Sequence, residues 1–293
     1  MSKLALGTVQ FGLPYGIANK KGQVGLEEAS KILERAFAAG IDTLDTAIAY
    51  GDSEKVLGKI GVDQWKIVSK LPAVPDNFSN TREVTIWVQE QLSESLRRLR
   101  VKSLYGILLH NPKDLVGPWG EAIFKALLDL RAQNKFQKIG VSVYSPEELN
   151  PLFLKYSFDL VQAPFNVFDR RLQTSGWLQK LYGMQVEVHA RSIFLQGLLL
   201  MSPDERPEKF RPWTDLFLRW HAWLNDMQIT PLQASLSYIL LQPKISNVLV
   251  GIDSYIQFQE LLTVLDTPSY FAPPDAISTD CADLIHPSRW GRL

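Results

Sequence analysis

The stretch "LDTAIAYGDSEKVLG", Leu44–Gly58, joins an apolar, β-like run to a helical pattern and places polar side chains at the junction. Asp45 lies in the apolar run, Tyr50 follows in a loop, and a helix is predicted to start near Asp52 or Ser53. In α/β barrels, active-site residues lie where strands end and the following loops begin. A carboxylate that closes a strand, with a phenol just beyond it, therefore marks a candidate site.

The same alternation of strands and helices extends along the whole chain. Near-continuous apolar runs are typical of parallel strands that are buried on both faces. Eight such runs occur: Leu4–Thr8, Thr43–Ala47, Lys66–Lys70, Tyr105–His110, Lys138–Val143, Leu160–Phe165, Gln185–Arg191 and Asn247–Ile252. Helical patterns lie between them, for example from Leu26 to Gly40, from about Thr81, and after Ser254, a plausible N-cap.

Eight strand–helix units in 293 residues predict a (β/α)8 barrel, a TIM barrel, that forms a single domain over residues 1–293. A doubly wound open sheet is the structural alternative, but no G-x-G-x-x-G follows the first strand. Two segments depart from the alternation. Met201–Trp213 is a polar excursion after the seventh strand, followed by an extra helical stretch, and a Pro-rich tail from Asp266 is expected to lie against the barrel near its mouth.

Composition excludes several classes of protein. The chain is 46% hydrophobic and 21% charged, as in an ordinary globular protein, and 31 basic residues balance 31 acidic ones. The balance gives no general attraction to nucleic acid or anionic membranes. One cysteine, Cys281, rules out an internal disulfide framework and a cysteine-rich metal site. Without a signal-like N-terminus or a membrane-spanning apolar run, we expect a cytoplasmic protein.

Four polar residues are predicted to meet at the barrel mouth. Asp45 closes the second strand, Tyr50 follows it, Lys70 ends the third strand and His110 ends the fourth. Each alone has an ordinary explanation as a turn, packing or surface residue. Together they suit proton transfer, because an ammonium beside a phenol stabilises the phenolate form. Asp45 would hold Lys70 charged, His110 would orient a carbonyl oxygen, and Tyr50 would protonate it.

These residues and their order resemble the motif of the aldo-keto reductase superfamily. The stretch Leu44–Gly58 is similar to the family signature almost residue for residue, and the similarity spans essentially the whole chain, although the usual N-terminal hairpin is missing. The resemblance implies NAD(P)H-dependent, reversible reduction of an aldehyde or ketone, such as a sugar or another small hydroxy-carbonyl compound. No side chain in the cluster can supply hydride, so this activity needs the nicotinamide cofactor.

The resemblance also implies where a cofactor would bind, extended across the barrel mouth. It assigns Ser142 and Gln162 to the carboxamide, although Val143 stands where an Asn often follows that Ser. Arg191 takes the place of a Tyr that stacks on the nicotinamide. The positions that would approach the pyrophosphate, the remaining phosphate and the adenine are Ser192, Leu195, Gly197, Gly251, Ser254, Gln257 and Glu260.

The eighth strand–helix junction leaves the choice of nucleotide open. The family often has basic residues at the positions of Asp253 and Gln257 to bind the 2′-phosphate of NADP, and neither is basic here. NADP(H) is the family default, and NAD(H) is the alternative. Phe11, Tyr15, His110 and Trp290 are predicted to line the substrate pocket. No pattern indicates a bound metal.

Three functions are compatible with these residues. Besides the reductase, the chain could be a regulatory subunit that binds the cofactor with little turnover, or a lyase or aldolase that uses a Schiff base on Lys70. A paired, charged lysine is a poor nucleophile, which disfavours the third function. The partner is expected to be a small carbonyl compound rather than nucleic acid or a membrane, and the protein a monomer or weak oligomer.

Overall fold

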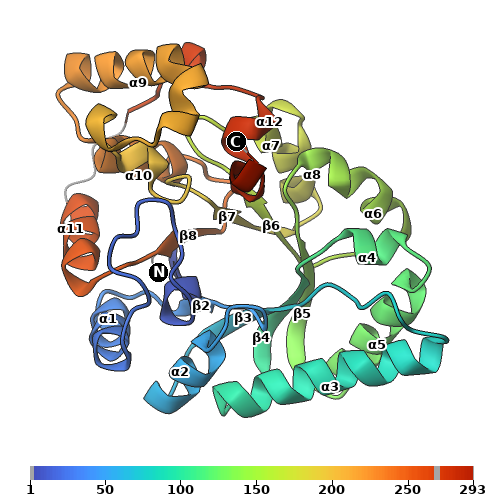
Figure 1. The fold of residues 1–293 in the computed structure, drawn as a ribbon. Helices are drawn as coiled ribbons and strands as arrows, with labels where there is room; N and C mark the ends of the chain where they lie inside the picture. The colour runs from blue at the N-terminus through green and yellow to red at the C-terminus, as the bar shows by residue number, and fades with distance from the viewer. Residues whose placement is uncertain (1–2, 267–270, 293) are drawn as a thin grey trace.

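The computed structural model describes residues 3–266 and 271–292, and its eight strands close into one parallel barrel (Figure 1). Each strand pairs with the next in sequence, and β1 pairs with β8 to close the ring. This arrangement confirms the predicted (β/α)8 fold. The strands are β1 Leu4–Gly7, β2 Thr43–Asp45, β3 Lys66–Leu71, β4 Leu104–Leu109, β5 Phe136–Ser142, β6 Leu160–Pro164, β7 Glu187–Arg191 and β8 Asn247–Gly251.

Helices surround the barrel on the outside, as Figure 1 shows. They bury apolar stripes against the strands, and the core forms where these stripes meet the outward-facing strand residues. The α-helices are α1 Leu26–Ala38, α2 Ser53–Ile60, α3 Thr81–Leu99, α4 Lys113–Val116, α5 Gly120–Ala132, α6 Leu149–Lys155, α7 Arg171–Thr174, α8 Trp177–Gly183, α9 Thr214–Met227, α10 Pro231–Leu240, α11 Tyr255–Asp266 and α12 Ala282–Ile285.

Local sequence signals explain where several helices begin and end. Asn80 caps α3 by accepting a hydrogen bond from Glu83 N (3.1 Å), and Ser254 caps α11 by accepting one from Gln257 N (3.3 Å). Gly40 follows α1 with a φ of +76°, in the left-handed region that glycine adopts without strain. The predicted starts of α3 and α11 are thereby confirmed.

Both departures from the alternation are present. The excursion after β7 consists of the short 3-10 helices η3 Leu198–Leu200, η4 Pro203–Glu205 and η5 Glu208–Trp213, followed by the extra helix α9. The described part of the tail forms η6 Asp275–Ile277, α12 and η7 Pro287–Arg292, and Figure 1 shows its end near β6, β7 and α7. Residues 267–270 of the predicted tail lie outside the described residues.

The tail is joined to the loop after β6. Arg170 Nη1 donates to Asp275 Oδ1 (2.8 Å), and Arg170 Nη2 donates to Pro274 O (2.9 Å). Thr279 N donates to Phe168 O (2.9 Å). These bonds hold the tail against the mouth side of the barrel, whereas the expectation that residues 1–293 form one domain stays a prediction. No described helix is both long and apolar enough to cross a membrane.

Candidate active site

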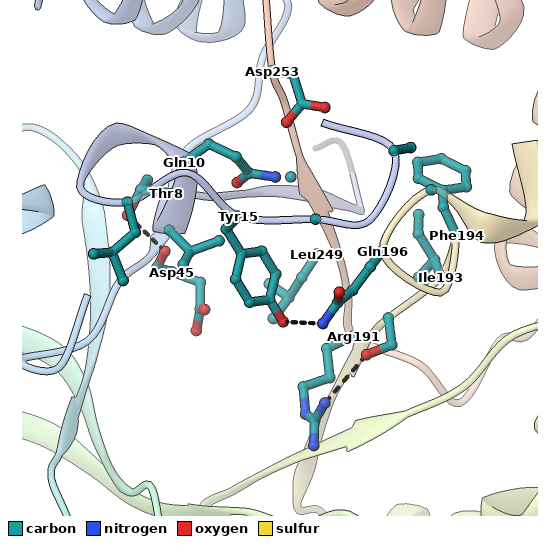
Figure 2. A pocket seen from close by; sticks show the side chains of 18 of the residues that line it. Thr8, Gln10, Tyr15, Asp45, Arg191, Ile193, Phe194, Gln196, Leu249 and Asp253 are labelled. Atoms are coloured by element: carbon teal, nitrogen blue, oxygen red, sulfur yellow. Dashed lines mark hydrogen bonds between the residues drawn. The ribbon is translucent and has the colours of Figure 1, made fainter. Parts of the chain in front are cut away.

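A cavity of about 680 Å³ opens at the carboxyl ends of the strands. Its walls come from the loops that follow β1, β2, β4, β5, β7 and β8, so it spans the barrel mouth. The volume lies within the range of sites that enclose a small molecule or cofactor. Figure 2 shows this cavity, with Asp45 and Arg191 among the side chains that face it.

The Asp45 carboxylate and the Lys70 ammonium form a buried ion pair at the cavity floor. Lys70 Nζ donates to Asp45 Oδ1 (2.6 Å) and to Thr46 O (2.9 Å), and Lys70 is 0% exposed. Burial alone would lower the pKa of Lys70, but the charges of Asp45 and Tyr50, together with the hydrogen bonds to both, outweigh burial and hold that pKa above its ordinary value. Lys70 is therefore a cation at neutral pH, which disfavours Schiff-base chemistry at this amine.

Tyr50 lies directly against this cation. Lys70 Nζ is 3.4 Å from Tyr50 Oη and 4.9 Å from the centre of the tyrosine ring. A positive charge at this distance stabilises negative charge on the phenol oxygen. The ammonium and the phenol thus meet as the sequence predicts, at the same end of the barrel.

Close packing of two loops positions Tyr50. Gly51 has a φ of +56°, and a Cβ built on Gly12 would lie 1.8 Å from Tyr50 O, so the β1 loop contacts the β2 loop backbone directly. Thr8 Oγ1 donates to Asp45 O (3.0 Å), and Ser53 Oγ donates to Thr8 O (2.8 Å). The buried hydroxyls of Thr8 and Ser53 therefore fix both ends of the turn that carries the tyrosine.

His110, the first residue after β4, faces Tyr50 across the floor. The two rings have centroids 5.7 Å apart and meet edge to face at 80°. Burial, together with the positive charges of Lys70 and Arg191, lowers the pKa of His110 to about 3. The imidazole is neutral at physiological pH, so it can donate one hydrogen bond without carrying charge.

A chain of hydrogen bonds links these residues across the barrel interior. Gln162 Nε2 donates to Asp45 Oδ2 (2.7 Å), and Ser142 Oγ donates to Gln162 Oε1 (3.2 Å). Asp45 ends β2, whereas Ser142 ends β5 and Gln162 lies within β6. The side chains predicted to hold a carboxamide are thus connected to the ion pair, and all of them share one floor.

Arg191 carries a positive charge into the cavity from the end of β7. Arg191 Nη2 donates to Val143 O (2.9 Å), Arg191 Nη1 donates to Ser192 Oγ (3.2 Å), and the guanidinium carbon lies 4.4 Å from the centre of the Tyr144 ring. Arg191 Nε is buried without a hydrogen-bond partner among the described residues. One donor is therefore left for a ligand.

The loop after β7 has an unusual backbone. Ser192, Leu195, Gln196 and Gly197 all have positive φ, between +46° and +89°. A Cβ built on Gly197 would lie 2.4 Å from Ala18 Cβ, so glycine permits close approach of the β1 loop there. The turn holds Ser192, Ile193, Phe194 and Gln196 along the cavity wall.

The β1 loop crosses the cavity mouth and binds the β7 loop (Figure 2). Gln196 Nε2 donates to Tyr15 Oη (2.9 Å), and the Lys20 ammonium pairs with Glu205 Oε1 (2.8 Å). Both bonds join exposed side chains. The cavity beneath this crossing is lined by residues from His110, after β4, to Gly251 at the end of β8.

Comparison with known proteins identifies the fold family. Residues 3–270 match the model of the Aldo/keto reductase family. The chain belongs to the aldo-keto reductases. It is thus an NAD(P)-dependent oxidoreductase that acts on CH–OH and C=O groups, as the motif predicts.

The relatives of this reductase are distant in sequence. An uncharacterized oxidoreductase of Bacillus subtilis, YqkF, is 24% identical over 282 residues, which cover 89% of this chain and 90% of that protein. An aldo-keto reductase of Gibberella moniliformis is 28% identical over 69% of this chain and 62% of its own length. The structure of aldo-keto reductase AKR11C1 from Bacillus halodurans, a holo form, superposes with a TM-score of 0.71 at 18% identity, covering 92% of this chain and 88% of that one.

The cavity of the reductase suits an extended polar cofactor. Three buried polar atoms that lack partners among the described residues belong to lining side chains: Gln10 Oε1, Arg191 Nε and Asp253 Oδ1. Buried polar atoms in native proteins are normally paired, so these are places where a ligand can complete the hydrogen bonding. No group of three or more His, Cys, Asp or Glu side chains in the described ranges is placed to hold a metal ion.

Most of the predicted site residues line this cavity, and five do not; one of the five is Lys70, which is fully buried behind the lining. Besides the floor residues, the lining includes Tyr15, Ser192, Gly197, Gly251, Ser254 and Gln257. Phe11 and Leu195 point into the core at 1% and 0% exposure, so neither reaches the lining. Phe11 lies in the 3-10 helix η1 Val9–Phe11, which turns its ring inward. Glu260 lies more than one turn along α11 and is exposed.

Trp290 does not cover the pocket as the sequence suggests. Its ring packs edge to face on Phe210 (4.9 Å between centroids), and Trp290 Nε1 donates to Leu284 O (2.9 Å). The tail instead reaches the edge of the cavity through His286, whose ring lies 4.7 Å from that of Tyr144. Tyr144 lines the cavity, and it stands two residues beyond Ser142, close enough to the strand end to have been a candidate.

Proposed function

We propose that this reductase converts an aldehyde or ketone, such as a sugar or another small hydroxy-carbonyl compound, to the alcohol, reversibly, with Tyr50 as the proton donor. The observation that carries the proposal is the contact of the Tyr50 phenol with the fully buried Lys70 ammonium at 3.4 Å. When bound, the reduced nicotinamide cofactor, NADPH or NADH, supplies the hydride. The residues of the chain supply orientation and the proton.

The proton path begins at Tyr50 Oη. As the substrate carbonyl becomes an alkoxide, the phenol gives its proton to that oxygen, and the phenolate left behind is stabilised by Lys70. Asp45 keeps Lys70 charged and aimed through the 2.6 Å bond. Lys70 thus acts on the substrate through Tyr50 and is a positioning residue.

Neutral His110 orients the substrate oxygen. Its imidazole ring lies beside Tyr50, and its pKa of about 3 keeps it uncharged over the physiological range. A neutral donor polarises a carbonyl without competing with Tyr50 as the acid. Ser142, Gln162 and Arg191 lie on the same floor and are proposed to hold the carboxamide end of the cofactor.

Replacement of Tyr50 by Phe tests this function. We expect Tyr50→Phe to lose about 10²–10⁴-fold of the turnover of NAD(P)H with an activated aldehyde, because the proton donor is gone. Nucleotide binding, measured by calorimetry, should persist. Tyr15→Phe is the matched control: it removes a hydroxyl from the same cavity, but that hydroxyl is bonded to Gln196 rather than to Lys70. Equal turnover in the two variants would reject Tyr50 as the donor.

The redox state of the single cysteine bears on the cellular compartment of the enzyme. Cys281 is exposed and unpaired, which suits a reducing compartment. We therefore propose a cytoplasmic enzyme. Fractionation of the source cells, followed by detection of the chain, tests this location directly.

A further inference from the structure

Acidic side chains lie at the end of the cavity formed by the β8–α11 junction. Asp253 lines the cavity there, and Glu28 of α1 contacts the same junction from the neighbouring helix. Lys21, an exposed lining residue, is the basic group whose charge acts on the Asp253 carboxylate. Lys20, its neighbour in sequence, is already paired with Glu205. Within the lining, the Asp253 carboxylate therefore faces one solvated ammonium, and Glu28 adds a second carboxylate at the junction just outside the lining.

Three backbone donors around the start of α11 are already used by side chains of the protein. Asp253 N donates to Gln257 Oε1 (2.8 Å), Tyr255 N donates to Glu28 Oε1 (2.9 Å), and Gln257 N donates to Ser254 Oγ (3.3 Å). A helix N-terminus normally attracts a phosphate through its free N–H groups. Here a carboxylate occupies that position, so a phosphate would meet negative charge in place of donors.

Two acceptors at this end are left without donors. Gln10 is 7% exposed, its side-chain amide lies against Gly251, and its Oε1 has no partner among the described residues. Asp253 Oδ1 is also buried without a partner. Figure 2 shows Gln10 and Asp253 on the same side of the cavity, away from Arg191. Unpaired buried acceptors are satisfied by a ligand that donates, as a hydroxyl does, and phosphate oxygens at neutral pH mainly accept.

The geometry of the barrel determines which part of a dinucleotide reaches this end. His110 follows β4 and Asp253 follows β8, and these strands lie on opposite sides of the eight-stranded ring. If the reacting ring lies beside Tyr50 and His110, as the proposed function requires, an extended dinucleotide carries its adenosine half across the mouth to β8. The ribose hydroxyls of that half then lie among the acceptors of Gln10 and Asp253.

We propose that Asp253 accepts a hydrogen bond from the adenosine ribose and, together with Glu28, excludes a 2′-phosphate, so that the enzyme prefers NADH to NADPH. This inference rests on the proposed function for the orientation of the cofactor. A like charge held against a carboxylate is a strong means of rejecting a ligand, and a hydroxyl in the same place completes the hydrogen bonding. Asp253 is thus the residue that determines nucleotide specificity.

Titration calorimetry of the intact protein with NADH and with NADPH tests the inference without relying on turnover. We expect NADH to bind at least about tenfold more tightly in the unmodified protein. In Asp253→Asn the amide oxygen still accepts a hydrogen bond while the charge is lost, so the preference should shrink by about tenfold, mainly through tighter binding of NADPH. Glu34→Gln is the control, since it removes one exposed carboxylate from α1 outside the cavity lining and should leave the ratio of the two affinities unchanged.

The outcomes separate this inference from the function on which it rests. If NADPH binds as tightly as NADH or more tightly, the inference is overturned, and the reductase function stands. If Asp253→Asn leaves the ratio of affinities unchanged while the protein still binds NADH, Asp253 is not the specificity residue. If neither nucleotide binds the unmodified protein, the proposed function itself fails.

Discussion

Removal of the Lys70 ammonium measures how much the buried ion pair of the site contributes to the free energy of unfolding. In Lys70→Met the side chain keeps its length, but Asp45 Oδ1 loses its donor at 2.6 Å and Thr46 O loses one at 2.9 Å. Breaking a buried ion pair on one side costs about 3–5 kcal/mol, because the remaining charge is left unpaired. Gln162 Nε2 still donates to Asp45 Oδ2 at 2.7 Å, so we expect a loss near the lower end, about 3 kcal/mol.

A double-mutant cycle shows whether the loss comes from the unpaired charge. Asp45→Asn leaves Lys70 unpaired, whereas Asp45→Asn with Lys70→Met leaves no charge at all. The double variant should therefore be more stable than the sum of the single losses predicts, by about 1–3 kcal/mol. Because the pKa of Lys70 is raised above 10.5, the stabilisation is fully present at neutral pH and is lost only as pH rises through the folded-state value.

Urea unfolding at pH 7, followed by circular dichroism, gives the free energies of unfolding. With a slope of about 3 kcal/mol per molar urea, a loss of about 3 kcal/mol lowers the midpoint of Lys70→Met by about 1 M. The slopes should agree among the four proteins, which shows that the same surface is exposed on unfolding. Losses that add to within about 0.5 kcal/mol, or a loss in Lys70→Met of under about 1 kcal/mol, would refute the reasoning.

Two further predictions concern titrating groups. His110, whose pKa is lowered to about 3, should show no chemical-shift change in a histidine NMR titration from pH 8 to pH 5, and a midpoint near 6.5 would contradict its burial beside Lys70 and Arg191. Burial alone would raise the pKa of the Glu187 carboxyl, but hydrogen bonds with His189, Lys138 and Tyr105 outweigh burial and lower that pKa to about 2. The stability that the ionised carboxylate contributes is therefore present above pH 4.5 and is lost as pH falls toward 2. In thermal unfolding at pH 7, we expect Glu187→Gln to be about 2 kcal/mol less stable than the unmodified protein. This difference should vanish near pH 2. A difference independent of pH would contradict that interpretation.

The strands and the cluster of Asp45, Tyr50, Lys70 and His110 were predictable because the sequence patterns that indicate them are local. Buried parallel strands are apolar throughout, and strand ends point to one rim, so Asp45, Lys70 and His110 could be placed together from their positions alone. The helix starts at Thr81 and after Ser254 also follow from short-range capping patterns.

The positions of the other residues around the cavity depend on tertiary contacts, which the hydrophobic periodicity of the sequence does not predict. Phe11 turns into the core because the chain forms η1 directly after β1, and Trp290 is buried by Phe210, a residue of the excursion after β7. The positive φ values of Ser192, Leu195, Gln196 and Gly197 have no counterpart in the sequence pattern "SIFLQG" beyond its glycine. Glu28 reaches Tyr255 N across 227 positions of sequence, a contact that only the closed barrel creates.

The hydrogen-bonded chain from Lys70 through Asp45 and Gln162 to Ser142 occupies the upper barrel interior, where many barrels place a layer of aliphatic side chains. Mutations that replaced it with well-packed hydrocarbon could raise the melting temperature, but they would remove the groups that handle the substrate. Directed evolution for heat resistance that also selects for turnover should therefore leave these four positions unchanged and collect its improvements on the outer helices and their connections.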